Sequence, residues 1–170
     1  RQPGSSMKPF LYALALERGW TAATLIDDAP LLEPVGVGLH SFRNYSRSYY
    51  GPLRLREALA NSLNTTAVRT VEYVGPSVYL ERLRALGFES LDRPSEFYGT
   101  GLALGAGEVT LLELTRAYTE LASLGRTRTL AYRVGGAGIR QRTEDVLNRD
   151  AAALIGDVLA DPHARRLEFG

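Results

Sequence analysis

A serine and a lysine stand three residues apart near the start of the chain, in Ser5-Ser6-Met7-Lys8. Residues at this spacing share one helical face, within side-chain reach of each other. A neutral lysine there takes the hydroxyl proton as the serine attacks a carbonyl carbon, and burial would be needed to keep the amine neutral. The pair predicts acyl transfer, with Ser5 as nucleophile and Lys8 as base. Ser6 is the competing nucleophile, but it precedes Lys8 by only two residues and would face elsewhere on a helix.

Lys8 is the only lysine of the chain, because the other 19 of its 20 basic residues are arginines. Arginine is effectively never deprotonated, whereas the pKa of a lysine responds to its surroundings. The single lysine is therefore a candidate for a role that arginine cannot fill. Codon bias that removed the other lysines is the alternative explanation.

Ser62-Leu63-Asn64 forms a second polar group, at a junction between two expected helices. Ser62 would relay a proton between Lys8 and a leaving amine, and Asn64 would hold an amide of a substrate. The structural alternative is that both residues only cap helices, which is where serine and asparagine are preferred.

The elements that must position these residues are mostly helical. Pro3-Gly4 signals a turn into a helix over residues 5–18, which Gly19 ends. Thr110 and Glu113 form a capping-box pattern. The further helices are expected over residues 53–61, 64–73, 76–86, 110–123 and 148–160. Short strands are expected at residues 24–26, before an Asp27-Asp28-Ala29-Pro30 turn, and at 127–134, with extended segments and loop between residues 35 and 52. The glycines between Gly101 and Gly107 lack the context of a phosphate-binding loop and indicate tight packing or a turn.

Composition excludes several classes of function. The net charge is +1 and the basic residues are not clustered, which makes nucleic acid a poor partner. There are no cysteines, so disulfides, thiol catalysis and cysteine-ligated zinc are excluded. The two histidines, His40 and His163, lie far apart and outside any recognisable motif. We therefore expect neither a metal, nor a cofactor, nor a Ser-His-Asp triad.

Three stretches, taken together, resemble one known family. Ser-x-x-Lys and Ser-x-Asn are two of the three motifs of penicillin-binding proteins and related β-lactamases. The residues around them, 1–19 and 44–64, and the later segment 104–118 are similar in order and content to the transpeptidase domain of class A (bifunctional) penicillin-binding proteins. Lys8-Pro-Phe-Leu-Tyr12 resembles the 1C type most.

The resemblance implies a helix-rich α+β fold, a partial penicillin-binding-protein or serine β-lactamase fold without its flanking sheet strands. It implies a D,D-transpeptidase whose serine is acylated by a D-Ala-D-Ala stem peptide, or by β-lactams, before a second stem-peptide amine forms the cross-link. Ser5, Lys8 and Ser62 would be catalytic, and Asn64 and Tyr45 would contact the substrate. The parent protein would be periplasmic and anchored in the inner membrane by a segment outside this chain, so this chain would not contact the membrane.

The third motif of the family, Lys-Thr-Gly, does not occur, since no second lysine exists. We therefore expect residues 1–170 to form a partial transpeptidase domain that ends before this motif and has weak or no activity alone. Two alternatives stay open. One is a DD-carboxypeptidase or β-lactamase, in which water accepts the acyl group. The other is a non-catalytic helical binding module, in which Ser5 and Ser62 are only caps.

Overall fold

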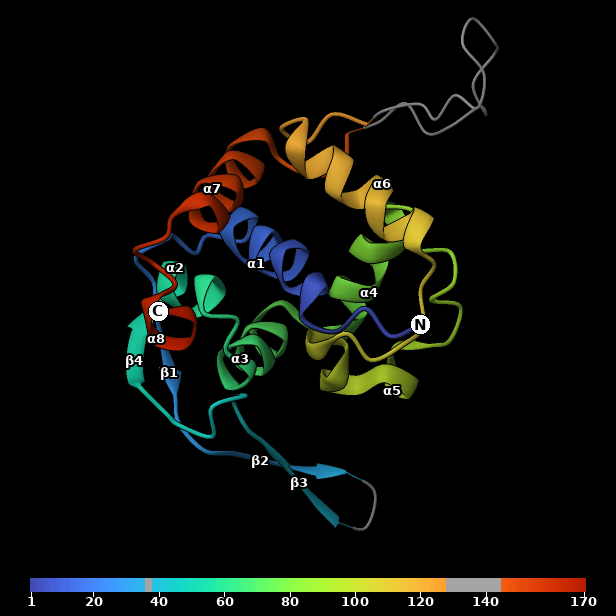
Figure 1. The fold of residues 1–170 in the computed structure, drawn as a ribbon. Coiled ribbons are helices and arrows are strands. Elements are labelled where there is room, and N and C mark those ends of the chain that lie inside the picture. The colour runs from blue at the N-terminus through green and yellow to red at the C-terminus, as the bar shows by residue number, and fades with distance from the viewer. Residues whose placement is uncertain (36–37, 128–144) are drawn as a thin grey trace, which may run out of the picture.

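The chain is built around one buried helix. In the computed structural model, which describes residues 1–35, 38–127 and 145–170, helix α1 (Lys8–Glu17) runs through the middle of the molecule (Figure 1). Every residue from Lys8 to Ala15 is buried. A helix that is buried on all sides needs neighbours on all sides. Helices α2, α3, α4 and α7 contact it directly, and Tyr118 of α6 packs edge-on against Phe10 at 5.2 Å between ring centroids.

The other helices follow in chain order and include several short turns. They are η1 (Gly4–Met7), α2 (Leu55–Ala60), α3 (Asn64–Val74), α4 (Pro76–Ala85), α5 (Ser95–Tyr98), η2 (Gly99–Leu104), α6 (Leu111–Ala122), α7 (Arg149–Ala160) and α8 (Arg166–Phe169), where η denotes a 3-10 helix. Within the described ranges, no helix is both long and apolar enough to cross a bilayer.

Four short strands form two antiparallel pairs. Strand β1 (Leu25–Asp28) pairs with β4 (Gly51–Arg54), with Asp28 opposite Gly51. Strands β2 (Leu31–Val35) and β3 (Gly38–Phe42) form a hairpin that extends away from the helices (Figure 1). The β1–β4 pair lies beside α2 and α3, and β4 leads directly into α2. The result is the helix-rich α+β fold that the sequence predicts.

Most predicted helices are confirmed within a few residues of their ends. The capping box of α6 is present: Thr110 Oγ1 accepts a hydrogen bond from Glu113 N at 3.2 Å, and Thr110 N donates to Glu113 Oε2 at 2.7 Å. Burial alone would raise the pKa of Glu113, but the hydrogen bonds that its carboxylate accepts from Thr110 and Ser90 lower this pKa overall.

Two boundaries were predicted wrongly. Residues 53 and 54 belong to β4 and not to the following helix, because Leu53 pairs with Ile26 and both are buried. Asp27 and Asp28 belong to β1 and not to a turn. The buried carboxylate of Asp28 accepts hydrogen bonds there, which a composition-based turn signal does not anticipate. Most of the strand predicted over 127–134 lies outside the described residues.

Candidate active site

Ser5 lies in the single turn η1 that leads into α1. Its side chain is exposed and, in the described part of the chain, has no hydrogen-bond partner. The neighbouring Ser6 hydroxyl instead donates to the Pro3 carbonyl oxygen at 2.7 Å. Of the two serines, Ser5 therefore presents the unengaged hydroxyl.

The Ser5 turn is held through its backbone by a close approach of two glycines. Gly4 and Gly105 both have positive φ angles, of 60° and 77°. A Cβ atom added to Gly105 would overlap the backbone of Gly4. This contact brings the end of η2 against η1, and it explains the glycines between 101 and 107 as tight packing.

Two tyrosines hold the following peptide units. Tyr118 donates to the Ser6 carbonyl oxygen at 2.9 Å, and Tyr79 donates to the Met7 carbonyl oxygen at 2.8 Å. Burial raises the pKa of both phenols, so each keeps the proton that it donates. The backbone on either side of Ser5 is thus fixed, while its side chain stays free.

Lys8 is a buried amine with polar neighbours. Its side chain reaches across to the junction of α2 and α3, where Nζ lies 2.5 Å from the Ser62 carbonyl oxygen, 2.7 Å from Asn64 Oδ1 and 3.3 Å from Ser62 Oγ. Only 1% of the residue is exposed. Burial lowers the pKa of Lys8 from 10.5 to about 7.

These contacts fit a neutral amine well. The Ser62 carbonyl and Asn64 Oδ1 accept hydrogen bonds only, and a neutral amine has two N–H groups for them. Its lone pair is then left for a hydroxyl proton. The structure gives no hydrogen bond between Lys8 and Ser5, and catalytic hydrogen bonds of this kind often tighten only when substrate binds.

Ser62 adopts a backbone conformation that is uncommon for a residue with a side chain. Its φ angle is 54°, at the junction between α2 and α3. Such conformations cost about 1–3 kcal/mol and persist where the surroundings determine them. Here the turn brings both the Ser62 carbonyl and the Ser62 hydroxyl to Lys8 Nζ.

A cavity of about 480 Å³ joins these residues. Its lining comes from η1, the segment before β4, the α2–α3 junction and α8. The lining residues are Ser5, Asn44, Tyr45, Asn61, Ser62, Leu63, Asn64, Glu168 and Phe169. Tyr45 stands at its mouth with 98% of the residue exposed. The predicted residues Ser5, Ser62, Asn64 and Tyr45 therefore share one cavity, and Lys8 reaches it through its hydrogen bonds.

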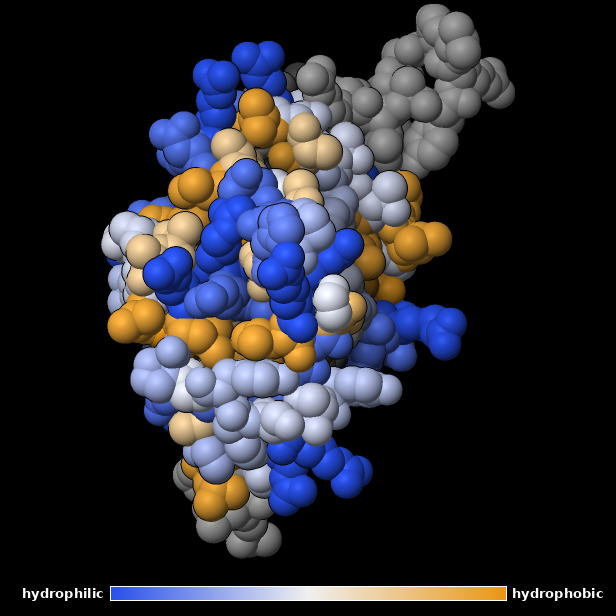
Figure 2. Space-filling model, turned by 60° about the vertical axis from the view of Figure 1, so that its left-hand side comes forward, coloured by the Kyte–Doolittle hydropathy of each residue, from blue (hydrophilic) through white to orange (hydrophobic). Residues whose placement is uncertain are grey.

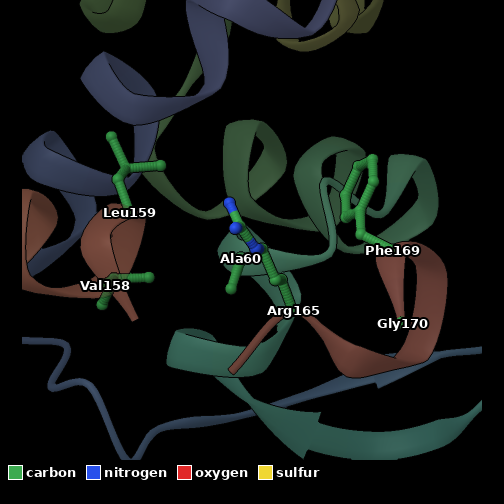
Figure 3. Close-up of a pocket in the computed structure, with 6 residues that line it drawn as sticks. All are labelled: Ala60, Val158, Leu159, Arg165, Phe169 and Gly170. Atoms are coloured by element: carbon green, nitrogen blue, oxygen red, sulfur yellow. The ribbon is translucent and has the colours of Figure 1, made fainter. Parts of the chain in front are cut away.

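The α8 side of this cavity is fixed by a few polar contacts. Glu168 accepts from Tyr50 at 3.0 Å and from Ser46 at 2.5 Å, and its backbone N–H donates to Asn61 Oδ1 at 3.0 Å. Phe169 also borders a second cavity of about 310 Å³, and Figure 3 shows Val158 and Leu159 across this cavity from Phe169. Neither Ser5 nor Ser62 lines that second cavity.

The face formed by α2, α7 and α8 is largely hydrophilic at its centre, with a band of apolar side chains beside it (Figure 2). Arg56 of α2 joins α7 there, through Asp157 at 2.6 Å and Asp161 at 2.8 Å.

Sequence reasoning gave no role to Asp28 and Asn44, although Asn44 bonds both to Asp28 and to the backbone of Asn64 at the start of α3. It also missed Glu168 and Phe169, because four residues of helix carry no periodic signal. One signal for such a contact was available: α3 begins after Leu63, which has no side chain that caps a helix, so its first N–H groups were open to a partner from elsewhere.

The chain belongs to the transpeptidase domain family of penicillin-binding proteins, a family of acyl-transferring enzymes, because the family model "Penicillin binding protein transpeptidase domain" matches residues 1–149. It is 37% identical over 129 residues to penicillin-binding protein 1A of Neisseria meningitidis, covering 74% of this chain and 16% of that protein. It is 40% identical over 118 residues to penicillin-binding protein 1A of Haemophilus influenzae, covering 69% of this chain and 14% of that protein. The chain thus spans about a sixth of the curated relatives that it matches.

Solved structures agree with this assignment. The crystal structure of penicillin-binding protein 1A from Haemophilus influenzae superposes with a TM-score of 0.66 at 36% identity, covering 74% of this chain and 18% of that one. Penicillin-binding protein A from M. tuberculosis, solved as an imipenem acyl-enzyme complex, superposes with a TM-score of 0.73. It covers 93% of this chain and 42% of that one, and at 22% identity it bears on the fold alone. The class A transpeptidase resemblance is confirmed, and the 1C subtype stays a prediction.

Proposed function

We propose that residues 1–170 form part of a D,D-transpeptidase domain that cross-links peptidoglycan stem peptides. The observation that carries this proposal is the set of contacts of the buried Lys8 Nζ. It is hydrogen-bonded to Ser62 and Asn64, which line the same cavity as Ser5. Family membership makes acyl transfer the reaction class, and this geometry supports the role that we propose for each residue.

The first half of the reaction forms an acyl-enzyme. Ser5 Oγ attacks the carbonyl carbon of the penultimate D-Ala, and the hydroxyl proton passes to the lone pair of Lys8 Nζ. The C–N bond to the terminal D-Ala then breaks, and the leaving amine takes a proton that returns from Lys8 through the Ser62 hydroxyl. A positioned base of this kind contributes about 10² to 10⁴ in rate.

The second half repeats these steps in reverse. The amine of a neighbouring stem peptide attacks the acyl-enzyme carbonyl and loses a proton to Lys8 by way of Ser62. The ester C–O bond then breaks, and Lys8 returns this proton to Ser5 Oγ. Asn64 contacts a backbone amide of the acyl donor, and Tyr45, at the mouth of the cavity, contacts the stem peptide. A β-lactam enters by the first half, because opening its ring acylates Ser5 without a departing amine.

We place this activity in the periplasm and in the full-length protein. The 170-residue chain alone is expected to be acylated weakly, because its sequence has no Lys-Thr-Gly motif to complete the family set.

The test is covalent labelling of the full-length protein by a fluorescent penicillin, with Ser5→Ala and Ser6→Ala as a matched pair. Ser5→Ala is expected to abolish the label, because no nucleophile remains. Ser6→Ala is expected to keep it, because Ser6 Oγ is engaged with Pro3. Label that survives Ser5→Ala would show that another residue is the nucleophile, and label lost only in Ser6→Ala would exchange the two roles.

A further inference from the structure

Asp28 is a buried carboxylate whose partners are neutral donors. Only 1% of the residue is exposed. Asn44 Nδ2 donates to its two oxygens at 2.8 and 2.9 Å, Tyr50 N donates at 2.9 Å, and Thr65 Oγ1 donates to Oδ1. A buried charge is costly unless hydrogen bonds compensate it. These donors come from the segment before β4 and from α3, so the carboxylate ties both segments to β1.

Asn44 passes this constraint on to the α2–α3 junction. Its Nδ2 group is fixed by Asp28 and by the Ser48 carbonyl oxygen at 2.9 Å, which leaves Oδ1 facing α3. Oδ1 accepts from Asn64 N at 2.8 Å and from Thr65 N at 3.5 Å. The amide of Asn44 thus has a fixed orientation, because its NH2 group faces acceptors and its oxygen faces donors.

This contact caps α3 from a distant part of the chain. The residue at the cap position is Leu63, which cannot accept a hydrogen bond from the first free N–H groups. Asn44 Oδ1 takes that place from 20 residues earlier. Asn64, the first residue of α3, is therefore held at its backbone by Asn44, while its side-chain Oδ1 accepts from Lys8 Nζ.

We propose that Asp28 and Asn44 are positioning residues for the transfer reaction. Asp28 orients Asn44, Asn44 fixes the start of α3, and the start of α3 sets Asn64 and Ser62 against the amine of Lys8. This inference rests on the proposed function, because it assigns these two residues to the same site. Neither of them touches the reacting atoms: they act through Asn64.

Two measurements test the proposal in the full-length protein. The first is the pKa of Lys8, from a pH titration of ¹³Cε-lysine NMR signals, with the Lys8 signal identified by its absence in Lys8→Arg. The second is the rate constant of acylation by a fluorescent penicillin. Titration of Tyr12 does not interfere near the pKa of Lys8, which is about 7. Burial, with a smaller contribution from the charge of Asp28, raises the pKa of Tyr12 to about 12.

The main variant is Asn44→Ala, which changes no charge. It is expected to slow acylation about 10- to 100-fold, the size of effect that misplaced catalytic groups produce. It is also expected to lower the pKa of Lys8 by about half a pH unit, because Nζ loses an acceptor that favours its charged form. A purely structural role predicts the opposite sign: a loosened core would admit water and raise the pKa towards 10.5.

An exchange of the two residues guards against a variant that simply fails to fold. Asp28→Asn alone sets an amide N–H against the donors of Asn44 and Tyr50. The double variant Asp28→Asn/Asn44→Asp again sets a donor on residue 28 against an acceptor on residue 44 and keeps an acceptor for Asn64 N, but it removes the donor to the Ser48 carbonyl oxygen, so recovery is expected to be partial. We expect it to recover about tenfold in acylation over Asp28→Asn. The matched control is Thr70→Val, a buried threonine of α3 whose hydroxyl bonds to Thr66 O and to Tyr12, and which should change acylation less than about twofold.

The outcomes are distinct. Acylation of Asn44→Ala within about twofold of wild type, or a raised Lys8 pKa, would overturn the positioning role, and recovery in the double variant would support it. If the wild-type protein takes no label at all, the proposed function fails. The titration of Lys8 in Asn44→Ala then still decides whether Asp28 and Asn44 act on the amine.

Discussion

The two sides of the cavity are held by different means. On the Ser5 side, a contact between Gly4 and Gly105 and hydrogen bonds to main-chain carbonyls fix the backbone, and the Ser5 hydroxyl is left unengaged. On the Lys8 side, side chains carry the constraint, from Asp28 through Asn44 and Asn64 to Nζ. The first side is fixed by shape and the second by directed polar contacts.

This difference matches what each group has to do. A nucleophile forms and breaks a covalent bond, so its side chain needs freedom on a backbone that does not move. A base must keep one atom in place and keep a low pKa, which calls for burial among acceptors that carry no charge. Arg56 illustrates the opposite case at the surface, because its carboxylate partners raise its pKa.

The largest effect is expected on the Lys8 side, from Lys8→Arg. Arginine keeps a positive charge, but it is effectively never deprotonated, so it cannot accept the proton of Ser5. Loss of the base should slow acylation by a fluorescent penicillin by about 10² to 10⁴. The unfolding midpoint should be measured alongside, because the larger guanidinium enters a buried site. A folded Lys8→Arg protein that is acylated at the wild-type rate would remove Lys8 from the mechanism.

The next largest effect should come from the Ser5 side, by Gly105→Ala. The added Cβ overlaps the backbone of Gly4, so η1 must shift, and a displacement of about 1 Å costs on the order of 10²-fold in rate. Gly99→Ala is the matched control: Gly99 also has a positive φ, of 55°, but its Cβ would meet open space. Both variants should lose stability, and only Gly105→Ala should lose acylation beyond that loss. Equal rates in the two would mean that the glycine contact does not position Ser5.

Sequence patterns singled out the proposed catalytic groups better than the groups that hold them. Ser5, Lys8, Ser62 and Asn64 stand in short motifs with fixed spacing, and the structure brings all four together. Helices were predicted well because propensity, caps and glycine stops act over a few neighbouring residues.

The supporting residues escaped prediction because their contacts are long-range. Asp28 lies in an Asp-Asp-Ala-Pro stretch that is typical of an exposed turn, and only its pairing in β1 and the approach of Asn44 make it buried. The role of Gly105 depends on a second glycine about 100 residues earlier. No local sequence pattern identifies a partner so far away in the chain. The absence of a capping side chain at Leu63 at least left room for a distant cap at the start of α3.

The effect that is smallest per pH unit is thermodynamic and concerns the Lys8 side alone. Burial lowers the pKa of Lys8 to about 7, while an unfolded chain keeps it at 10.5. Below pH 7 both states are protonated, and the folded state carries the full cost of the buried charge. Between pH 7 and 10.5 only the unfolded state holds the proton, so stability rises with pH, by at most about 1.4 kcal/mol per pH unit.

Lys8→Met removes this contribution. Urea unfolding of both proteins at several pH values from 7 to 10 should therefore show a difference in unfolding free energy that grows with pH in favour of wild type, while all other titrations cancel. Parallel curves would mean that the pKa of Lys8 is the same in both states, and the Lys8 side would then lack the property that separates it from the Ser5 side.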